Sequence, residues 1–320
     1  MHRRGTLAHK CIYRCTDMFF FWCEYFTAHL STYIDIDYQD TQSITAVCVS
    51  PSSTYLLVFS SSLSLRVFEL PQSLEPALKS IQPIRVVAKA HESPVHVCTT
   101  DPTSTYLASG SADGVVKVWD IARGYVTHVF KGHGGVVSAI TFNYPQDPST
   151  ISQRAQMQLI TASVDTRIRI FELSEASRAT SKPGTILDGH VSVPRALDVS
   201  RDGKWLISGG RDSVVLVWDL SSMSLQSGSK RKGKDKEAAP RLLKTIPILE
   251  RVEAAGLLQF DEDLTGSPSD PTNLRFYTGG ENGVIKIWSV RDGNVLFKLG
   301  TESSTISDDQ EEQRQIVDIL

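Results

Sequence analysis

The chain has 320 residues, of which 41% are hydrophobic and 22% are charged, and 33 basic against 36 acidic side chains give a formal net charge of −3. This is the composition of an ordinary globular protein, and it excludes a chain that is strongly basic overall. The five cysteines are an odd number without a disulfide-like framework, which favours a reducing compartment.

Residues 1–40 stand outside the pattern that organises the rest of the chain, and we expect them to form a poorly ordered leader. The apolar run at 18–26 contains Glu24 and lacks a small-residue cleavage site, which argues against a secretion signal. It is also much shorter than the about 20 apolar residues that span a bilayer. Zinc is disfavoured because the C-x3-C-x7-C-x5-H spacing matches no common arrangement for the four potential ligands, Cys11, Cys15, Cys23 and His29.

From residue 41 onward, short runs of alternating apolar and polar residues recur between turn signals, which predicts β-strands. The first group spans Ile44 to Leu70 and is followed by an outer strand at 84–88. This group has no leading histidine, and Ser62 stands where later groups have Asp. We therefore expect it to lack an internal polar chain and to be held by packing.

Residues 91–120 are the clearest copy of the repeated pattern. The copy begins with His91, passes an Asp-Gly turn at Asp113 and ends on Trp119. His91 and Asp113 are 22 residues apart, and Asp113 and Trp119 are 6 apart. The fourth group repeats both distances, from His190 to Asp212 and on to Trp218.

The third group keeps the final spacing of 6, from Asp165 to Phe171, but contains a polar insertion at 145–157. In its strand at 166–171, Ile168 and Ile170 alternate with Arg167 and Arg169. We expect the two arginines to lie on a solvated strand face, and contact with an acidic partner is the alternative.

The segment 221–240 loses the apolar periodicity and predicts an exposed loop. Its basic run is a candidate nuclear import signal or RNA-contacting arm, although a purely solvated loop is the alternative. No aromatic residues interleave the basic ones, which argues against a nucleic-acid-binding domain. The run consists of Lys230, Arg231, Lys232, Lys234 and Lys236.

A strand is expected at 242–249, and the fifth group follows with a strand at 253–260, an acidic insertion at 261–272, two strands within 274–289 and an outer strand at 294–299. Residues 315–320 predict the first strand of a further group. Propeller blades with loop insertions are therefore expected over 41–320.

Four positions recur in the groups: a leading histidine, a Ser or Thr four residues before the turn acid, the acid, and an aromatic residue. This arrangement resembles the WD40-repeat family, whose blades contain a His–Ser/Thr–Asp–Trp hydrogen-bond chain, and a buried chain of this kind requires that every member is paired. The candidate sets are His91, Ser109, Asp113 and Trp119; His133, Thr161, Asp165 and Phe171; His190, Ser208, Asp212 and Trp218; and Thr278, Asn282 and Trp288.

The resemblance implies an all-β WD40 β-propeller with about five recognisable four-stranded blades. Because WD40 rings usually close with seven, we expect an incomplete part of a seven-bladed ring. A Ser-His-Asp nucleophilic triad is the catalytic alternative for one set, but repetition argues against it, and no Walker A, H-E-x-x-H or G-x-S-x-G motif occurs. The chain is therefore expected to have no catalytic, metal or cofactor site.

A finer resemblance links residues 84–290 to the first propeller of the transducin beta-like WD40 subunits of the small-subunit processome, the U3 small-nucleolar-RNA particle. It depends most on residues 244–258 (KTIPILERVEAAGLL), which replace the usual Gly-His at a blade entrance. It implies a nucleolar scaffold in pre-rRNA processing whose partners are other WD40 subunits and U3 snoRNA or pre-rRNA, with no membrane and no small-molecule substrate. The alternative is a generic WD40 adaptor, such as a ubiquitin-ligase substrate receptor or a G-protein-beta-like scaffold, that reads a modified peptide through Arg167 or Arg211.

Overall fold

The structure is a computed structural model that describes residues 11–15, 18–22, 36, 41–71, 81–144, 157–173, 183–221, 240–258 and 273–299. Most of the predicted leader lies outside these ranges, including Cys23 and His29. So do the predicted strand at 315–320, the basic run at 230–236, the whole predicted insertion at 261–272, and all but the ends of those at 145–157 and 221–240.

The described part of the chain is all β, and five antiparallel sheets of four strands follow one another along the sequence, which confirms the predicted fold class. We number these sheets blades 1 to 5. Blade 1 contains β3 (Ile44–Val49), β4 (Tyr55–Ser60), β5 (Leu65–Glu69) and β6 (Arg85–Val87). Blade 2 contains β7 (Val95–Thr100), β8 (Tyr106–Ser111), β9 (Val116–Asp120) and β10 (Val126–Phe130).

The remaining three blades repeat the same order of strands. Blade 3 contains β11 (Val137–Asn143), β12 (Gln158–Ser163), β13 (Ile168–Glu172) and β14 (Thr185–Leu187). Blade 4 contains β15 (Pro194–Val199), β16 (Trp205–Gly210), β17 (Val214–Asp219) and β18 (Arg241–Pro247). Blade 5 contains β19 (Val252–Leu258), β20 (Arg275–Gly280), β21 (Ile285–Ser289) and β22 (Val295–Leu299).

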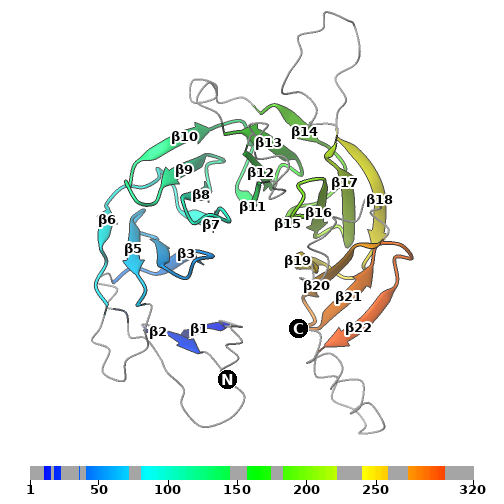
Figure 1. The fold of residues 1–320 in the computed structure, drawn as a ribbon, viewed down its shortest axis with the longest axis horizontal. Helices are drawn as coiled ribbons and strands as arrows, with labels where there is room; N and C mark the ends of the chain where they lie inside the picture. Colours follow the sequence, from blue (N-terminus) through cyan, green and yellow to red (C-terminus); the bar gives the residue numbers. More distant parts are fainter. Residues whose placement is uncertain are drawn as a thin grey trace, which may run out of the picture.

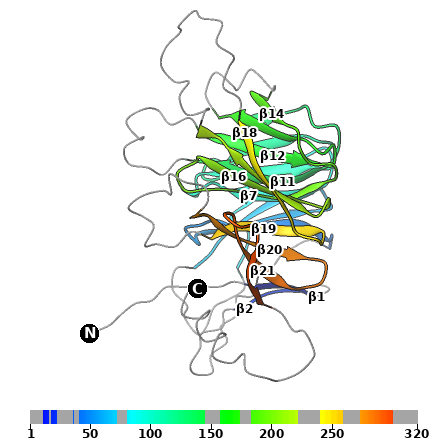
Figure 2. The same ribbon diagram turned by 90° about the vertical axis from the view of Figure 1, so that its right-hand side faces the viewer.

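The blades stand around a common centre, with the first strand of each blade innermost and the fourth at the rim (Figure 1). Together they form a disc whose thickness is about the length of one strand (Figure 2). The arc is open between blades 1 and 5, where a separate antiparallel pair lies, made of β1 (Cys11–Cys15) and β2 (Met18–Trp22) (Figure 1).

Hydrophobic clusters fill the space between successive blades, so most strands are buried on both faces. In blade 4, Ile207 and Val217 pack toward blade 5, whereas Leu206 and Trp218 pack toward blade 3. A sheet that is covered on both sides has near-continuous apolar strands, as the VVLVW run of β17 shows.

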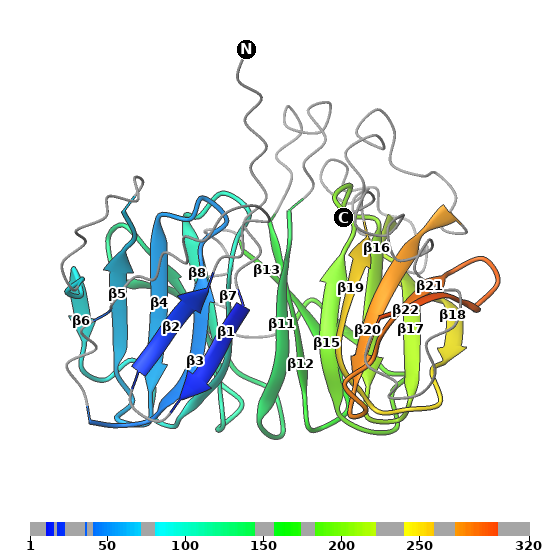
Figure 3. The same ribbon diagram turned by 90° about the horizontal axis from the view of Figure 1, so that it is seen from below.

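The meander within each blade places its connections on two opposite faces of the disc. One face carries the turns between the second and third strands together with the links from each blade to the next, and we call it the entrance face. Its short turns run along the lower edge of the disc in Figure 3.

Candidate functional site

The repeated polar residues meet just inside the entrance face, and in blade 4 they form one continuous chain. Trp218 Nε1 donates to Ser208 Oγ at 3.0 Å, and Ser208 Oγ lies 2.8 Å from His190 Nε2. His190 Nδ1 lies 2.8 Å from Asp212 Oδ2. Because an ionised carboxylate only accepts, Nδ1 carries the histidine proton and Ser208 donates to Nε2. All four predicted residues of blade 4 are therefore brought together.

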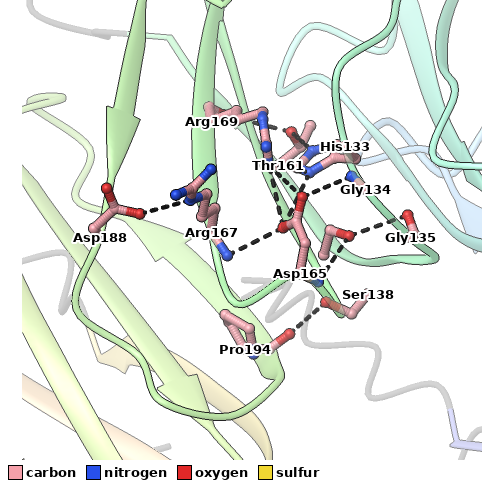
Figure 4. Close-up of polar contacts among 11 residues, drawn as sticks. His133, Gly134, Gly135, Ser138, Thr161, Asp165, Arg167, Arg169, Asp188 and Pro194 are labelled. Atoms are coloured by element: carbon pink, nitrogen blue, oxygen red, sulfur yellow. Dashed lines mark hydrogen bonds and ion pairs between the residues drawn. The ribbon is translucent and has the colours of Figure 1, made fainter.

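In blade 3 the same positions are joined differently, because Arg169 enters the network (Figure 4). His133 Nε2 lies 2.7 Å from Thr161 Oγ1, whereas its Nδ1 lies 2.7 Å from Arg169 Nη1 and 3.8 Å from Asp165 Oδ1. Asp165 accepts from Gly134 N at 2.7 Å and pairs with Arg169 at 2.8 Å. Since a guanidinium only donates, His133 accepts at Nδ1 and its proton is on Nε2, the opposite tautomer to blade 4.

The expectation that both blade 3 arginines lie on a solvated face is wrong for Arg169. Its side chain is 6% exposed, against 53% for Arg167, which pairs with Asp188 at 3.0 Å. The reason is that β13 packs between two neighbouring blades, so the positions that alternate with Ile168 and Ile170 also lie in the interior. Arg167 reaches solvent because it precedes the strand, which begins at Ile168.

Blade 2 brings together only three of its four predicted residues. His91 Nε2 lies 2.8 Å from Ser109 Oγ, and Trp119 Nε1 donates to the same oxygen at 2.9 Å. Asp113 is exposed and accepts from Val115 N at 2.9 Å instead of from the histidine. As a result, the buried His91 Nδ1 has no hydrogen-bond partner among the described residues.

Blade 5 has no histidine, and Glu250 takes part in its network. Trp288 Nε1 donates to Thr278 Oγ1 at 2.8 Å, as in the other tryptophan blades. Glu250 accepts from Asn282 Nδ2 at 3.0 Å and forms an ion pair with Lys286 at 2.6 Å, in which the two side chains are 8% and 18% exposed.

Glu250 occupies the place that a histidine has in blade 4, as the neighbouring glycine shows. A Cβ atom on Gly210 would lie 2.8 Å from His190 Nδ1, and a Cβ atom on Gly280 would lie 2.7 Å from Glu250 Cδ. Both glycines end the second strand of their blade. The carboxylate therefore stands where the imidazole would be.

Blade 1 also departs from the expectation that its internal polar chain is missing. Ser60 Oγ lies 2.6 Å from Ser62 Oγ and 2.9 Å from Ser64 Oγ, and Arg66 Nη1 donates to Ser64 Oγ at 2.6 Å. A serine cluster capped by a buried arginine thus replaces the histidine and the acid.

Burial keeps the three histidines neutral. The pKa of His91 is lowered to about 4 by burial and by the nearby Lys117. The pKa of His133 is lowered to about 4 by burial and by Arg169. Burial also lowers the pKa of His190, although Asp212 opposes the shift.

The serine, histidine and aspartate of blade 4 have the contacts of a nucleophilic triad but not its access. Ser208 is 0% exposed and its oxygen is already held by Trp218 Nε1. A nucleophile must reach the carbon that it attacks, so this arrangement can hold a blade together but offers no reactive oxygen to a substrate.

On the entrance face, two arginines share one carboxylate across the boundary between blades 4 and 5. Arg195 Nε lies 2.9 Å from Glu253 Oε2, and Arg211 Nε lies 2.7 Å from Glu253 Oε1. Next to them, Arg251 pairs with Glu281 at 3.2 Å. Every charged residue of the ERVEAA stretch therefore has a partner.

Two features of these networks were not predicted, although the sequence contains a signal for each. A cation stands two residues before the aromatic in four of the five blades, as Arg66, Lys117, Arg169 and Lys286, whereas blade 4 has Leu216. Glu250 precedes Asn282, the turn residue of blade 5, by 32 residues, and His133 precedes the turn residue Asp165 of blade 3 by the same number. This equal spacing is the signal that Glu250 stands at the histidine position.

The described ranges contain no cluster of His, Cys, Asp or Glu that could hold a metal ion. In the same ranges, no helix is long and apolar enough to cross a membrane. The candidate basic run, from Lys230 to Lys236, lies outside the described residues.

Comparison with known proteins shows that the chain is similar to WD-repeat proteins. The family model described as "WD domain, G-beta repeat" matches residues 82–120, 124–172 and 181–219. The chain is 32% identical over 261 residues to transducin beta-like protein 3 of Bos taurus. It is 31% identical over 268 residues to U3 small nucleolar RNA-associated protein 13 of Saccharomyces cerevisiae.

Each of these two alignments covers 82% of this chain but only 28% and 27% of the relative, so the chain spans little more than a quarter of their length. A shorter match, 29% identical over 200 residues, links it to nuclear distribution protein nudF of Aspergillus niger.

Proposed function

Because the chain belongs to the WD40-repeat family, we propose that it is a non-catalytic scaffold of the U3 small nucleolar ribonucleoprotein, the small-subunit processome, in pre-rRNA processing and 18S rRNA maturation. The observation that carries this proposal is the 31% identity with U3 small nucleolar RNA-associated protein 13 over 82% of the chain. Its partners are other WD40 subunits of that particle and U3 snoRNA or pre-rRNA.

The blade networks support a structural rather than a catalytic role. Their hydroxyl groups are buried, as the 0% exposure of Ser109, Thr161 and Ser208 shows. Their hydrogen bonds join strands within one blade, and a propeller built in this way presents its faces for binding. We place the protein in the nucleolus and assign the basic run at 230–236 to nuclear import.

The test is immunoprecipitation of the tagged full chain from its native cells, with U3 snoRNA quantified against a spliceosomal small nuclear RNA. We expect U3 to be enriched at least tenfold and the protein to be nucleolar, and we expect nuclear import to fall when the five basic residues of 230–236 are replaced by Gln. Recovery of ubiquitin-ligase or G-protein partners without U3 would instead support the generic adaptor.

A further inference from the structure

Leu249 is a large apolar residue in a conformation that favours glycine, and its side chain does not pack. Its φ is 64° and it is 91% exposed. The residue that precedes the histidine in blades 3 and 4 is a glycine, Gly132 or Gly189, and Gly132 has a φ of 132°. A bulky residue held at positive φ is strained, and its exposure gives no burial energy that offsets the strain. The side chain of Leu249 therefore does not stabilise the fold of the isolated chain.

A second exposed apolar side chain lies on the other side of the same turn. Val191 is 87% exposed, and its backbone N donates to Asp212 Oδ2 at 3.0 Å. The N of Ile248, next to Leu249, donates to Ser213 O at 2.9 Å. The turn at 211–213 of blade 4 is thus flanked by two exposed apolar residues, Val191 and Leu249.

The same turn carries Arg211, one of the two arginines that hold Glu253. Arg211 and Arg195 each use Nε for this carboxylate, and their Nη groups have no other hydrogen-bond partner among the described residues. The two side chains are 45% and 39% exposed. Two guanidinium groups against one carboxylate leave a net positive charge whose donors are held in place before any ligand arrives.

We propose that Val191, Leu249, Arg195 and Arg211 form a docking site for an acidic peptide segment of a partner protein. A carboxylate of the segment accepts hydrogen bonds from the Nη groups, which bind carboxylates in a bidentate manner. An apolar side chain next to it covers Leu249 and Val191 and removes their surface from water. Glu253 orients both guanidinium groups, which lowers the ordering cost of binding.

The chemistry of this surface favours a peptide over RNA. Leu249 and Val191 offer aliphatic surface, whereas single-stranded RNA is held by aromatic stacking along a positively charged groove. The proposal concerns this face alone, so it can fail or succeed independently of the association with U3.

The test begins with selection of a phage-displayed library of random 12-residue peptides on the purified 320-residue chain. We expect the enriched peptides to contain Asp or Glu beside Leu, Ile, Val or Phe. A fluorescein-labelled synthetic copy of the most enriched peptide is then titrated by fluorescence anisotropy against the wild type and three variants.

The variants separate binding from folding. Leu249→Gly relieves the strained φ, so we expect an unchanged or higher Tm but a Kd at least fivefold higher. The double variant Arg195→Ala with Arg211→Ala is expected to raise the Kd at least tenfold. Arg123→Ala, in the turn between β9 and β10 on the opposite face, is the matched control because its side chain is also exposed, at 71%, and we expect its Kd within twofold of wild type.

Three outcomes overturn the proposal. One is that no acidic peptide is enriched, and another is that Leu249→Gly and the double variant bind the peptide as tightly as wild type. The third is that a 12-nucleotide oligouridine binds more tightly than the peptide and displaces it, which would make this face a nucleic-acid surface.

Discussion

At the scale of single residues, the turn aspartates of blades 2 and 4 have different hydrogen-bond partners, which are Val115 N for Asp113 and His190 Nδ1 for Asp212. Blades 2 and 4 have the same distances between histidine, acid and tryptophan, yet Asp212 is bonded to its histidine and Asp113 is not. The two blades differ two residues before the tryptophan, where blade 2 has Lys117 and blade 4 has Leu216. Lys117 lies close enough to His91 to lower its pKa, and its Nζ donates to Ala90 O at 2.7 Å.

The first prediction follows from this difference. Asp212→Ala leaves His190 Nδ1 without an acceptor in a buried site, which should lower the free energy of unfolding by about 2–3 kcal/mol. Asp113→Ala removes only an exposed turn hydrogen bond and should cost less than about 1 kcal/mol. Urea unfolding of both variants measures the difference. Equal losses would mean that the two aspartates have the same role after all.

At the scale of elements, long basic side chains form hydrogen bonds that tie the outer strand of one blade to the next blade. Arg85 of β6 donates to Ile121 O at 2.8 Å and to Ala122 O at 2.9 Å. Lys244 of β18 donates to Val290 O and Arg291 O, each at 2.7 Å. Each tie ends on the turn between the third and fourth strands of the next blade, so it holds neighbouring sheets together at the rim.

The second prediction tests one of these ties through a glycine. Gly124 has a φ of 73°, and a Cβ atom there would lie 2.4 Å from Arg85 Nη1. Gly283 has a φ of 70° but nothing within 4 Å. Gly283→Ala should therefore cost only the backbone strain, about 1–2 kcal/mol. Gly124→Ala should cost more, because the guanidinium must also leave its two carbonyls.

Urea unfolding gives the two costs, and hydrogen exchange shows where the structure opens. We expect faster exchange in the turn at 121–124 for Gly124→Ala only. If both substitutions cost the same, the arginine tie contributes nothing to stability.

The strands could be predicted from the sequence, but many of the side-chain hydrogen bonds and ion pairs between them could not. Alternation and turn residues predict strands such as β9 and β17 because backbone pairing and apolar burial depend on local pattern. The partner of a buried polar side chain depends on which residue of another strand reaches it. For that reason the sequence pattern predicts a solvated Arg169 and does not single out Glu250 as the residue at the histidine position, although both lie in correctly predicted blades.

At the scale of the whole molecule, each blade relies on its neighbours to cover its faces. Ile207 and Val215 of blade 4 are 0% exposed because blade 5 covers them. At the corresponding positions of blade 5, Tyr277 and Ile285 are 37% and 46% exposed, since no described blade covers that face. Stability is therefore shared along the array, and a change inside one blade is felt by the next.

The third prediction concerns the buried histidines of blades 2, 3 and 4. In the unfolded chain they take up protons below an ordinary pKa of 6.5, whereas folded His91 and His133 do so only near 4. The unfolded state therefore binds more protons in this window, and stability falls as the pH drops from about 6.5 toward 4. Between pH 7 and pH 5 the loss should be about 2 kcal/mol for each of these two histidines.

Urea unfolding at pH 5, 6, 7 and 8 measures this loss, and calorimetry in buffers of different ionisation enthalpy counts the protons taken up on unfolding. Lys117→Met is the informative variant, because it removes a cation that lowers the pKa of His91. The variant should lose less stability than wild type between pH 7 and pH 5. A free energy of unfolding that is the same at pH 5 and pH 7 would show that these histidines are not kept neutral by the fold, because burial would then impose no cost on their protonation.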